Sequence, residues 1–195
     1  QKKLRGFFFG GETKLGIKVP YLGRSYQSKK EVSSILADAL PGTIILALAA
    51  MLFACFAGIA IGVLAAVKKD SWTDRTAIIS SIAGISAPSF FMAILIAYLF
   101  GVVLHAYTGL QLTGSLYEID EITGERYLAL KNLLLPACTL GIRPLAIIVQ
   151  LTRSSMLDVL GQDYIRTAYA KGLSKNAVIC RHALRNALNP VITAI

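Results

Sequence analysis

Charged side chains are absent from two long stretches of this sequence. Residues 43–67 and 76–104 contain no Asp, Glu, Lys, Arg or His, although the whole chain has 20 Lys and Arg, 11 Asp and Glu and a formal net charge of +9. At a rise of about 1.5 Å per residue, a helix of either length crosses the roughly 30 Å hydrocarbon core of a bilayer. Because 195 residues cannot sheathe two such helices in a soluble core, the pattern excludes an ordinary soluble domain and predicts a membrane protein.

The sequence also has few of the residues from which metal, redox or hydrolytic sites are built. Its three cysteines, Cys55, Cys138 and Cys180, form no CxxC pair, which favours apolar packing over metal binding or redox chemistry. The acidic residues of 105–131 have no regular spacing with His105, so a metal site there is unsupported. No Ser-His-Asp, HExxH or paired-carboxylate arrangement lies at membrane depth. These absences argue against an enzyme embedded in the membrane.

A phosphate-binding loop is missing as well. The motif G-x-x-x-x-G-K-[ST] has its lysine directly after the second glycine, whereas in the nearest string, residues 11–18, the lysine is displaced and the hydroxyl is absent. We therefore expect no nucleotide cofactor in this chain. Lys and Arg flank the apolar stretches and no stacking-aromatic motif accompanies them, so the expected partner is the lipid bilayer and not nucleic acid.

The first part of the chain, residues 1–42, is predicted to lie outside the membrane core. Residues 1–30 are polar and rich in glycine and basic side chains, which is typical of a loop-rich segment. In residues 31–40, apolar side chains recur at helical spacing, with polar side chains on the other face. This predicts an amphipathic helix along the membrane interface that ends at Pro41-Gly42.

Residues 43–195 are predicted to form an all-α, polytopic transmembrane helical bundle. The first span, 43–67, contains Gly58 and Gly62 in a GxxxG-like pair, which is a weak indication of close helix packing. The last apolar stretch, 186–195, is only half as long as a span needs to be. We therefore expect the chain to be a fragment of a longer membrane protein.

The second span, 76–104, is interrupted at Pro88. Proline removes a backbone donor and clashes with the preceding turn, so a kink is expected there, with Ser86 and Ser89 near enough to satisfy the freed carbonyl groups. The kink either lines a translocation path or serves packing alone.

The third span, about 132–152, contains Arg143 at its centre. A charge at that depth costs about 2.5–3.5 kcal/mol on insertion scales unless it faces protein or water, so Arg143 is expected to point into the bundle. It either lines a translocation path or forms an ion pair with another helix.

Three spans place residues 68–75 and 153–185 on one side of the membrane, and 1–42 and 105–131 on the other. Lys and Arg in short loops and near the spans mark the cytoplasmic side. Nine such residues belong to 68–75 and 153–185, which are therefore predicted to be cytoplasmic. The opposite side has five: Arg24, Lys29, Lys30, Arg126 and Lys131.

The cytoplasmic segment near the C-terminus predicts a helix, a glycine turn and a second helix. Apolar residues at spacings of three and four indicate a helix over 153–171, Gly172 fits its left-handed C-cap, and Ser174 fits the N-cap of the next helix. On an α-helical wheel one side of the second helix holds Lys175, Val178, Arg181, His182 and Arg185. The opposite side holds Ile179, Cys180, Ala183, Leu184, Ala187 and Leu188. This helix binds either a cytoplasmic partner or anionic headgroups.

Several motifs resemble those of the permease subunits of ATP-binding cassette importers, in the dipeptide, oligopeptide and nickel branch. Segment 153–185 resembles the cytoplasmic coupling loop of those permeases, which contacts the ATPase. The matching residues are Arg166, Thr167, Ala168, Gly172, Leu173, Ser174, His182, Leu184 and Arg185. Of the general importer pattern the chain keeps Ala168, Gly172 and Leu184; it departs from it with Arg166, Thr167, His182 and Arg185, and these departures match the peptide branch. The likeness covers roughly residues 20–195 and includes Leu22–Tyr26, Leu40-Pro41, Ser71–Arg75 and Leu151–Ser155.

The resemblance implies a fold, a function and partners. It implies a partial type I importer transmembrane domain over 43–195 and an extracytoplasmic segment over 1–42, in a multi-pass protein of the bacterial inner membrane. It implies transport of di- or oligopeptides together with a second permease subunit, two cytoplasmic ATPase subunits that bind ATP and Mg, and an extracytoplasmic substrate-binding protein. Residues 153–185 would contact the ATPase. The alternative is an ion- or proton-coupled secondary transporter or channel, but such proteins commonly have carboxylates within their spans and none is seen in these spans.

Overall fold

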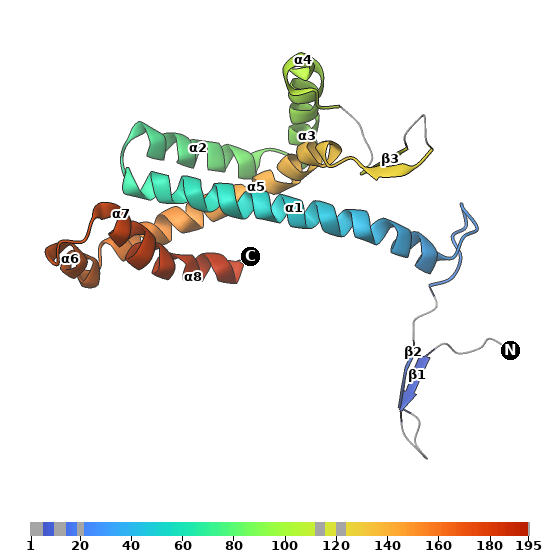
Figure 1. The fold of residues 1–195 in the computed structure, drawn as a ribbon, viewed down its shortest axis with the longest axis horizontal. Coiled ribbons are helices and arrows are strands. Elements are labelled where there is room, and N and C mark those ends of the chain that lie inside the picture. The colour runs from blue at the N-terminus through green and yellow to red at the C-terminus, as the bar shows by residue number, and fades with distance from the viewer. Residues whose placement is uncertain (1–5, 10–14, 19–21, 112–115, 120–123, 195) are drawn as a thin grey trace. The chain divides into compact units, whose positions relative to one another are not determined.

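The computed structural model describes residues 6–9, 15–18, 22–111, 116–119 and 124–194 (Figure 1). The helices are α1 (Val32–Val67), α2 (Trp72–Ser86), α3 (Ser89–Tyr98), α4 (His105–Thr108), α5 (Lys131–Leu160), α6 (Asp163–Ala170), α7 (Lys175–Ala177) and α8 (Leu184–Ala194), with π-helical turns η1 (Leu99–Val103) and η2 (Val178–Ala183). Two short antiparallel hairpins join β1 (Gly6–Phe9) to β2 (Leu15–Lys18) and β3 (Tyr117–Ile119) to β4 (Arg126–Leu128). The chain divides into two compact units, Gln1–Ile44 and Ile45–Ile195. The predicted helical membrane fold is confirmed.

The expected helix end at Pro41-Gly42 is wrong. Helix α1 contains Pro41 and continues without a break to Val67. A proline removes one backbone donor, and an apolar helix tolerates that loss where nearby hydroxyls and local adjustments satisfy the backbone. The carbonyl left without its backbone donor is that of Ala37, four residues before the proline. The Thr43 hydroxyl donates to a different carbonyl of the same turn, that of Ala39, 3.1 Å away.

Two helices of the described residues, α1 and α5, are each long and apolar enough to cross a membrane. The predicted interruption at Pro88 is confirmed and is sharper than a kink. Helix α2 ends at Ser86 and α3 begins at Ser89, and the two segments are bent by 113° relative to each other, so that α2 and α3 with η1 form either one broken span or a re-entrant loop.

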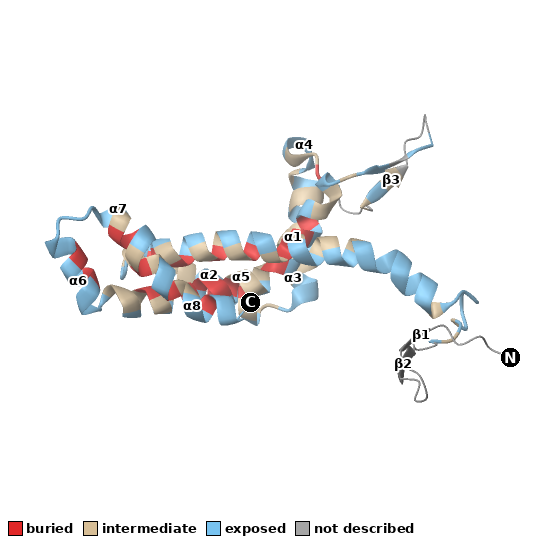
Figure 2. Cartoon of the chain, turned by 60° about the horizontal axis from the view of Figure 1, so that its bottom comes forward, coloured by how far each residue is buried: buried red, intermediate tan, exposed pale blue. Residues whose placement is uncertain are grey.

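The core of the second unit lies where α1, α5 and α8 face one another, and most side chains on the outer surfaces of these helices are exposed (Figure 2). Glycines allow the close approach of α1 and α5. A Cβ atom on Gly58 would lie 2.8 Å from Ile148 Cγ2, and one on Gly62 would lie 2.6 Å from Thr152 Cβ. The GxxxG-like pair is therefore a real helix contact, because neither glycine has room for a side chain.

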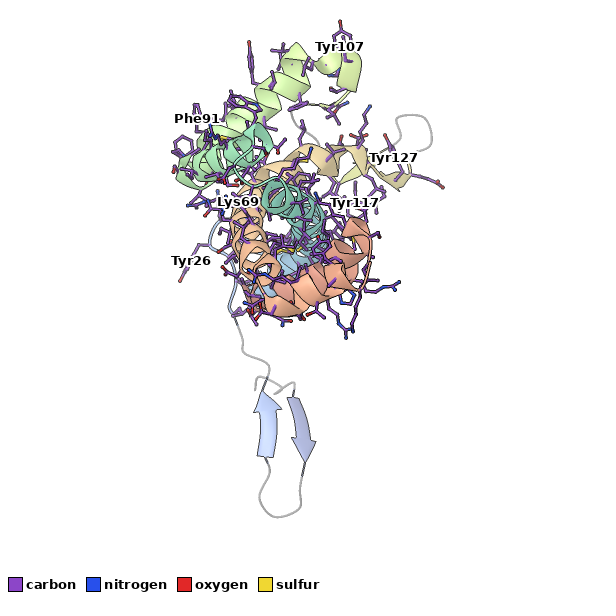
Figure 3. The ribbon with its side chains drawn as sticks, turned by 90° about the vertical axis from the view of Figure 1, so that its left-hand side faces the viewer. Tyr26, Lys69, Phe91, Tyr107, Tyr117 and Tyr127 are labelled. Atoms are coloured by element: carbon purple, nitrogen blue, oxygen red, sulfur yellow. The ribbon has the colours of Figure 1, made fainter. Side chains whose placement is uncertain are left out.

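The α1–α2 turn and the helices α6 and α7 lie at the same end of the second unit, as the predicted topology requires (Figure 1). Figure 3 views the molecule from that end, with Lys69 of the turn labelled. A hydrophobic cluster joins these parts of the fold: Ala66 of α1, Met156 of α5, Ile165 and Ala168 of α6, Val178, Ile179 and Ala183 of η2, and Ala187 of α8.

Candidate coupling elbow and membrane cavity

Residues 163–185, which we call the elbow, are turned by a glycine in the left-handed conformation. Gly172 has φ +80°, its N–H donates to the carbonyl of Tyr169 at 2.9 Å, and the N–H of Leu173 donates to the carbonyl of Ala168 at 3.3 Å. These two bonds form a Schellman motif, which closes the end of α6. Ser174 then caps the next helix, since its hydroxyl accepts from the Ala177 N–H at 3.4 Å. Both cap predictions are confirmed.

The predicted single helix over 153–171 is wrong. Helix α5 ends at Leu160, and α6 begins at Asp163 after a Gly161-Gln162 step in which Gln162 is extended, with ψ 150°. Glycine is a poor helix former, and Asp163 in the first turn of α6 has a favourable interaction with the helix dipole. The elbow is therefore a separate element at the end of α5.

The predicted orientation of the second helix is wrong at Val178 and Cys180. Val178 is completely buried and Cys180 is exposed, whereas an α-helical wheel gives the opposite. The π-helical turn η2 explains the difference because it inserts one extra residue into the turn. The completely buried positions are therefore Val178, Ala183, Ala187 and Val191, separated by five, four and four residues.

Most of the predicted coupling residues are on the outer surface of the elbow. Arg166, Thr167, Gly172, Leu173, Ser174 and Arg185 are exposed, His182 and Leu184 are half-buried, and Ala168 is buried in the hydrophobic cluster. Arg166 lies 3.5 Å from the carboxylate of Asp163, and both side chains are largely in solvent, so the pair adds little stability. Arg166 and Arg185 leave the exposed surface of the elbow cationic.

An ion pair that was not predicted from the sequence joins the first turn of α2 to α5. Arg153 Nε lies 2.5 Å and Nη2 2.7 Å from the two carboxylate oxygens of Asp74, which is only 2% exposed. The N–H of Asp70 donates to the same carboxylate at 3.0 Å. The sequence did contain a signal for this pair, because Asp74 and Arg153 have opposite charges and each lies just outside a predicted span, on the predicted cytoplasmic side.

A cavity of about 670 Å³ lies beside the break between α2 and α3, with α5 as its other wall. Of the predicted path residues, Ser89 and Arg143 line it, whereas Ser86 and Pro88 are exposed without lining it. The α5 wall includes Asn132, Thr139 and Arg143. The side chain of Arg143 is exposed in this chain and opens onto the cavity.

The β3–β4 hairpin is attached to the end of α5 nearest this cavity. Glu118 accepts from the Tyr127 hydroxyl at 2.7 Å and from the Asn132 side-chain amide at 2.6 Å. These two donors, the tyrosine first, lower the pKa of Glu118 below its ordinary value. Figure 3 shows Tyr117 and Tyr127 on this hairpin.

Long apolar helices, a broken helix pair beside a cavity and a basic elbow define the chain as part of a helical membrane protein. Residues 58–195 match the family described as "Binding-protein-dependent transport system inner membrane component". The chain belongs to this family, and the predicted resemblance is confirmed.

Two dipeptide transport system permease proteins named DppB are among its relatives. The one from Haemophilus influenzae is 40% identical over 186 residues, covering 89% of this chain and 56% of the relative. The one from Escherichia coli K12 is 41% identical over 190 residues, covering 89% and 56%. A di/tripeptide transport system permease protein of Pseudomonas aeruginosa is 41% identical over 185 residues, covering 88% and 55%. The chain thus spans little more than half the length of these relatives.

Proposed function

We propose that this chain is part of a permease subunit of an ATP-binding cassette importer for di- or oligopeptides. Family membership and the relatives' names support this proposal. The observation that carries it is the elbow: a glycine-turned pair of helices packed on the ends of α1 and α5, with a cationic outer surface.

In the proposed mechanism the elbow transmits force. Its outer surface sits in a groove on a cytoplasmic ATPase subunit, and closure of the ATPase dimer on ATP and Mg moves the elbow. Because Ile165, Ala168 and Val178 are buried against α1 and α5, the elbow cannot shift without moving those helices. Such rigid-body coupling would switch the bundle between inward-open and outward-open states.

The proposal includes the remaining partners. A second permease subunit completes the translocation path, two ATPase subunits supply the energy, and an extracytoplasmic binding protein delivers the peptide. ATP and Mg bind to the ATPase, so this chain is not an enzyme and holds no cofactor of its own. It is a multi-pass protein of the bacterial inner membrane, with the elbow in the cytoplasm.

Nothing in the structure favours the alternative of an ion- or proton-coupled transporter. Coupling of that kind relies on ionisable groups within the membrane, usually carboxylates. Among the described residues, those that line the cavity beside the α2–α3 break include no Asp or Glu.

Gly172 provides the test. In the full-length permease, assembled with its ATPase and reconstituted with its binding protein, Gly172→Val should reduce peptide uptake per ATP hydrolysed, because a β-branched residue at φ +80° is strained and deforms the turn. Gly172→Asn is the matched control, since asparagine tolerates this conformation and should retain most of the coupling. Undiminished uptake by the Gly172→Val permease would refute the mechanism.

A further inference from the structure

Arg143 is a cation in the apolar middle of α5. No hydrogen bond or ion pair joins its side chain to any of the residues that the structure describes. Position 143 is 12 residues from the start of α5 at Lys131 and 17 from its end at Leu160, so it is near the centre of the span. A guanidinium at this depth requires water or an anion, because lipid does not stabilise the charge.

Among the residues that the structure describes, Arg143 is the only charged side chain that lines the cavity. The other described lining residues provide neutral polar groups, those of Ser89, Gln111, Asn132 and Thr139, and apolar walls. The volume of about 670 Å³ is within the range of small-molecule sites. A mostly apolar cavity with one cation and several amide and hydroxyl groups suits a small molecule that has one anionic end.

The break between α2 and α3 adds to this polarity. Helix α3 begins at Ser89, on the cavity wall, and its N-cap is Pro88, whose side chain makes no capping hydrogen bond. The first N–H groups of a helix have no partner within the helix, and together with the helix dipole they favour an anion. In discontinuous membrane helices such N-termini commonly face anionic groups of the substrate.

We propose that this cavity is a peptide subsite in which Arg143 binds the terminal carboxylate of the transported peptide. The Ser89 end of α3 adds polarity favourable to the same carboxylate, and the apolar wall accommodates the side chains. The inference rests on the proposed function and deepens it, because it assigns recognition of the peptide's anionic end to the permease itself. Two parallel N–H donors make arginine better suited than lysine to hold a carboxylate.

The test is direct binding to the assembled transporter in lipid nanodiscs, without the binding protein. Radiolabelled alanyl-alanine is competed with unlabelled alanyl-alanine or with its C-terminal amide, which lacks the anionic end. The unaltered transporter should prefer the acid over the amide by about tenfold or more, as expected for a charge-assisted pair. Arg143→Gln should lose this preference, and Arg143→Lys should restore part of it.

The results of this binding experiment distinguish a failure of the inference from a failure of the proposed function. If Arg143→Gln retains the preference for the acid, or weakens acid and amide equally, Arg143 does not bind the carboxylate and the inference fails; in the second case its anion comes from another segment of the protein. If the unaltered transporter binds and transports no peptide at all, the proposed function itself fails. Loss of the preference in Arg143→Gln with unchanged affinity for the amide supports the inference.

Discussion

Asp74 and Arg153 form a two-point ion pair that holds the first turn of α2 against α5, with N–O distances of 2.5 and 2.7 Å. The carboxylate is almost completely buried, whereas the Arg153 side chain retains 22% of its exposure. The pair lies in the same end of the fold as the elbow. It therefore extends the proposed force-bearing unit from the elbow to the start of α2.

Asp74→Ala should lower the free energy of unfolding by roughly 3 kcal/mol, because breaking a buried ion pair leaves its partner uncompensated. Thermal unfolding of the full-length permease in detergent measures the effect. Asp158→Ala is the matched control, since Asp158 is exposed on α5 and has no ion pair among the described residues. In a double-mutant cycle the losses from Asp74→Ala and Arg153→Met should be non-additive. Additive losses would contradict the coupling.

Gly62→Ala should destabilise the contact between α1 and α5. The new Cβ atom would lie 2.6 Å from Thr152 Cβ and 2.9 Å from the carbonyl of Val149, so the helices must separate, at a cost of about 1–3 kcal/mol. Gly161→Ala is the control, because its Cβ atom would meet only ordinary contacts at 3.6 Å or more. Equal unfolding temperatures for the two variants would show that α1 and α5 do not pack as closely as the structure indicates.

Thr152→Val should leave the stability unchanged or raise it by up to about 1 kcal/mol. The Thr152 hydroxyl is buried and has no hydrogen-bond partner among the described residues, so a methyl group of similar shape removes an unsatisfied polar atom. Thr139→Val is the comparison, because the Thr139 hydroxyl donates to the Leu135 carbonyl at 2.8 Å. Chemical unfolding of both variants measures the difference. A marked loss for Thr152→Val would reveal a partner of that hydroxyl elsewhere in the full-length protein.

Hydropathy and capping rules predicted much of this fold. The uncharged run 43–67 predicted the apolar part of α1, Pro88 predicted the break between α2 and α3, and Gly172 and Ser174 predicted the elbow's caps. The failed predictions had different causes. Local preferences at Gly161 and Asp163 end α5 earlier than the apolar spacing predicted, and α1 tolerates Pro41 within a continuous helix. The Asp74–Arg153 pair, in contrast, joins residues 79 positions apart.

The π-helical turn η2 leaves no pattern in the sequence that a helical wheel of 3.6 residues per turn detects. The side-chain exposure that it produces can be tested at positions 178 and 180. In a variant without other cysteines, Cys180 should react readily with a maleimide, whereas a cysteine placed by Val178→Cys in a Cys180→Ser background should react far more slowly. Mass spectrometry of the full-length permease measures both rates. The reverse order of reactivity would mean that the segment is an uninterrupted α-helix.

The cytoplasmic position of the elbow is tested by the same exposed thiol. With Cys55 and Cys138 replaced by alanine, a membrane-impermeant maleimide should label Cys180 in inside-out vesicles and leave it unlabelled in intact spheroplasts. The reason is the concentration of Lys and Arg around 68–75 and 153–185, which orients those segments toward the cytoplasm.

A cysteine introduced by Tyr107→Cys on α4, at an exposed position of the opposite predicted side, is the control and should show the reverse pattern. Co-expression of the ATPase should then slow the labelling of Cys180 in the vesicles, because the bound subunit covers the elbow. Labelling of Cys180 in intact spheroplasts alone would place the elbow outside the cell, where no ATPase could reach it.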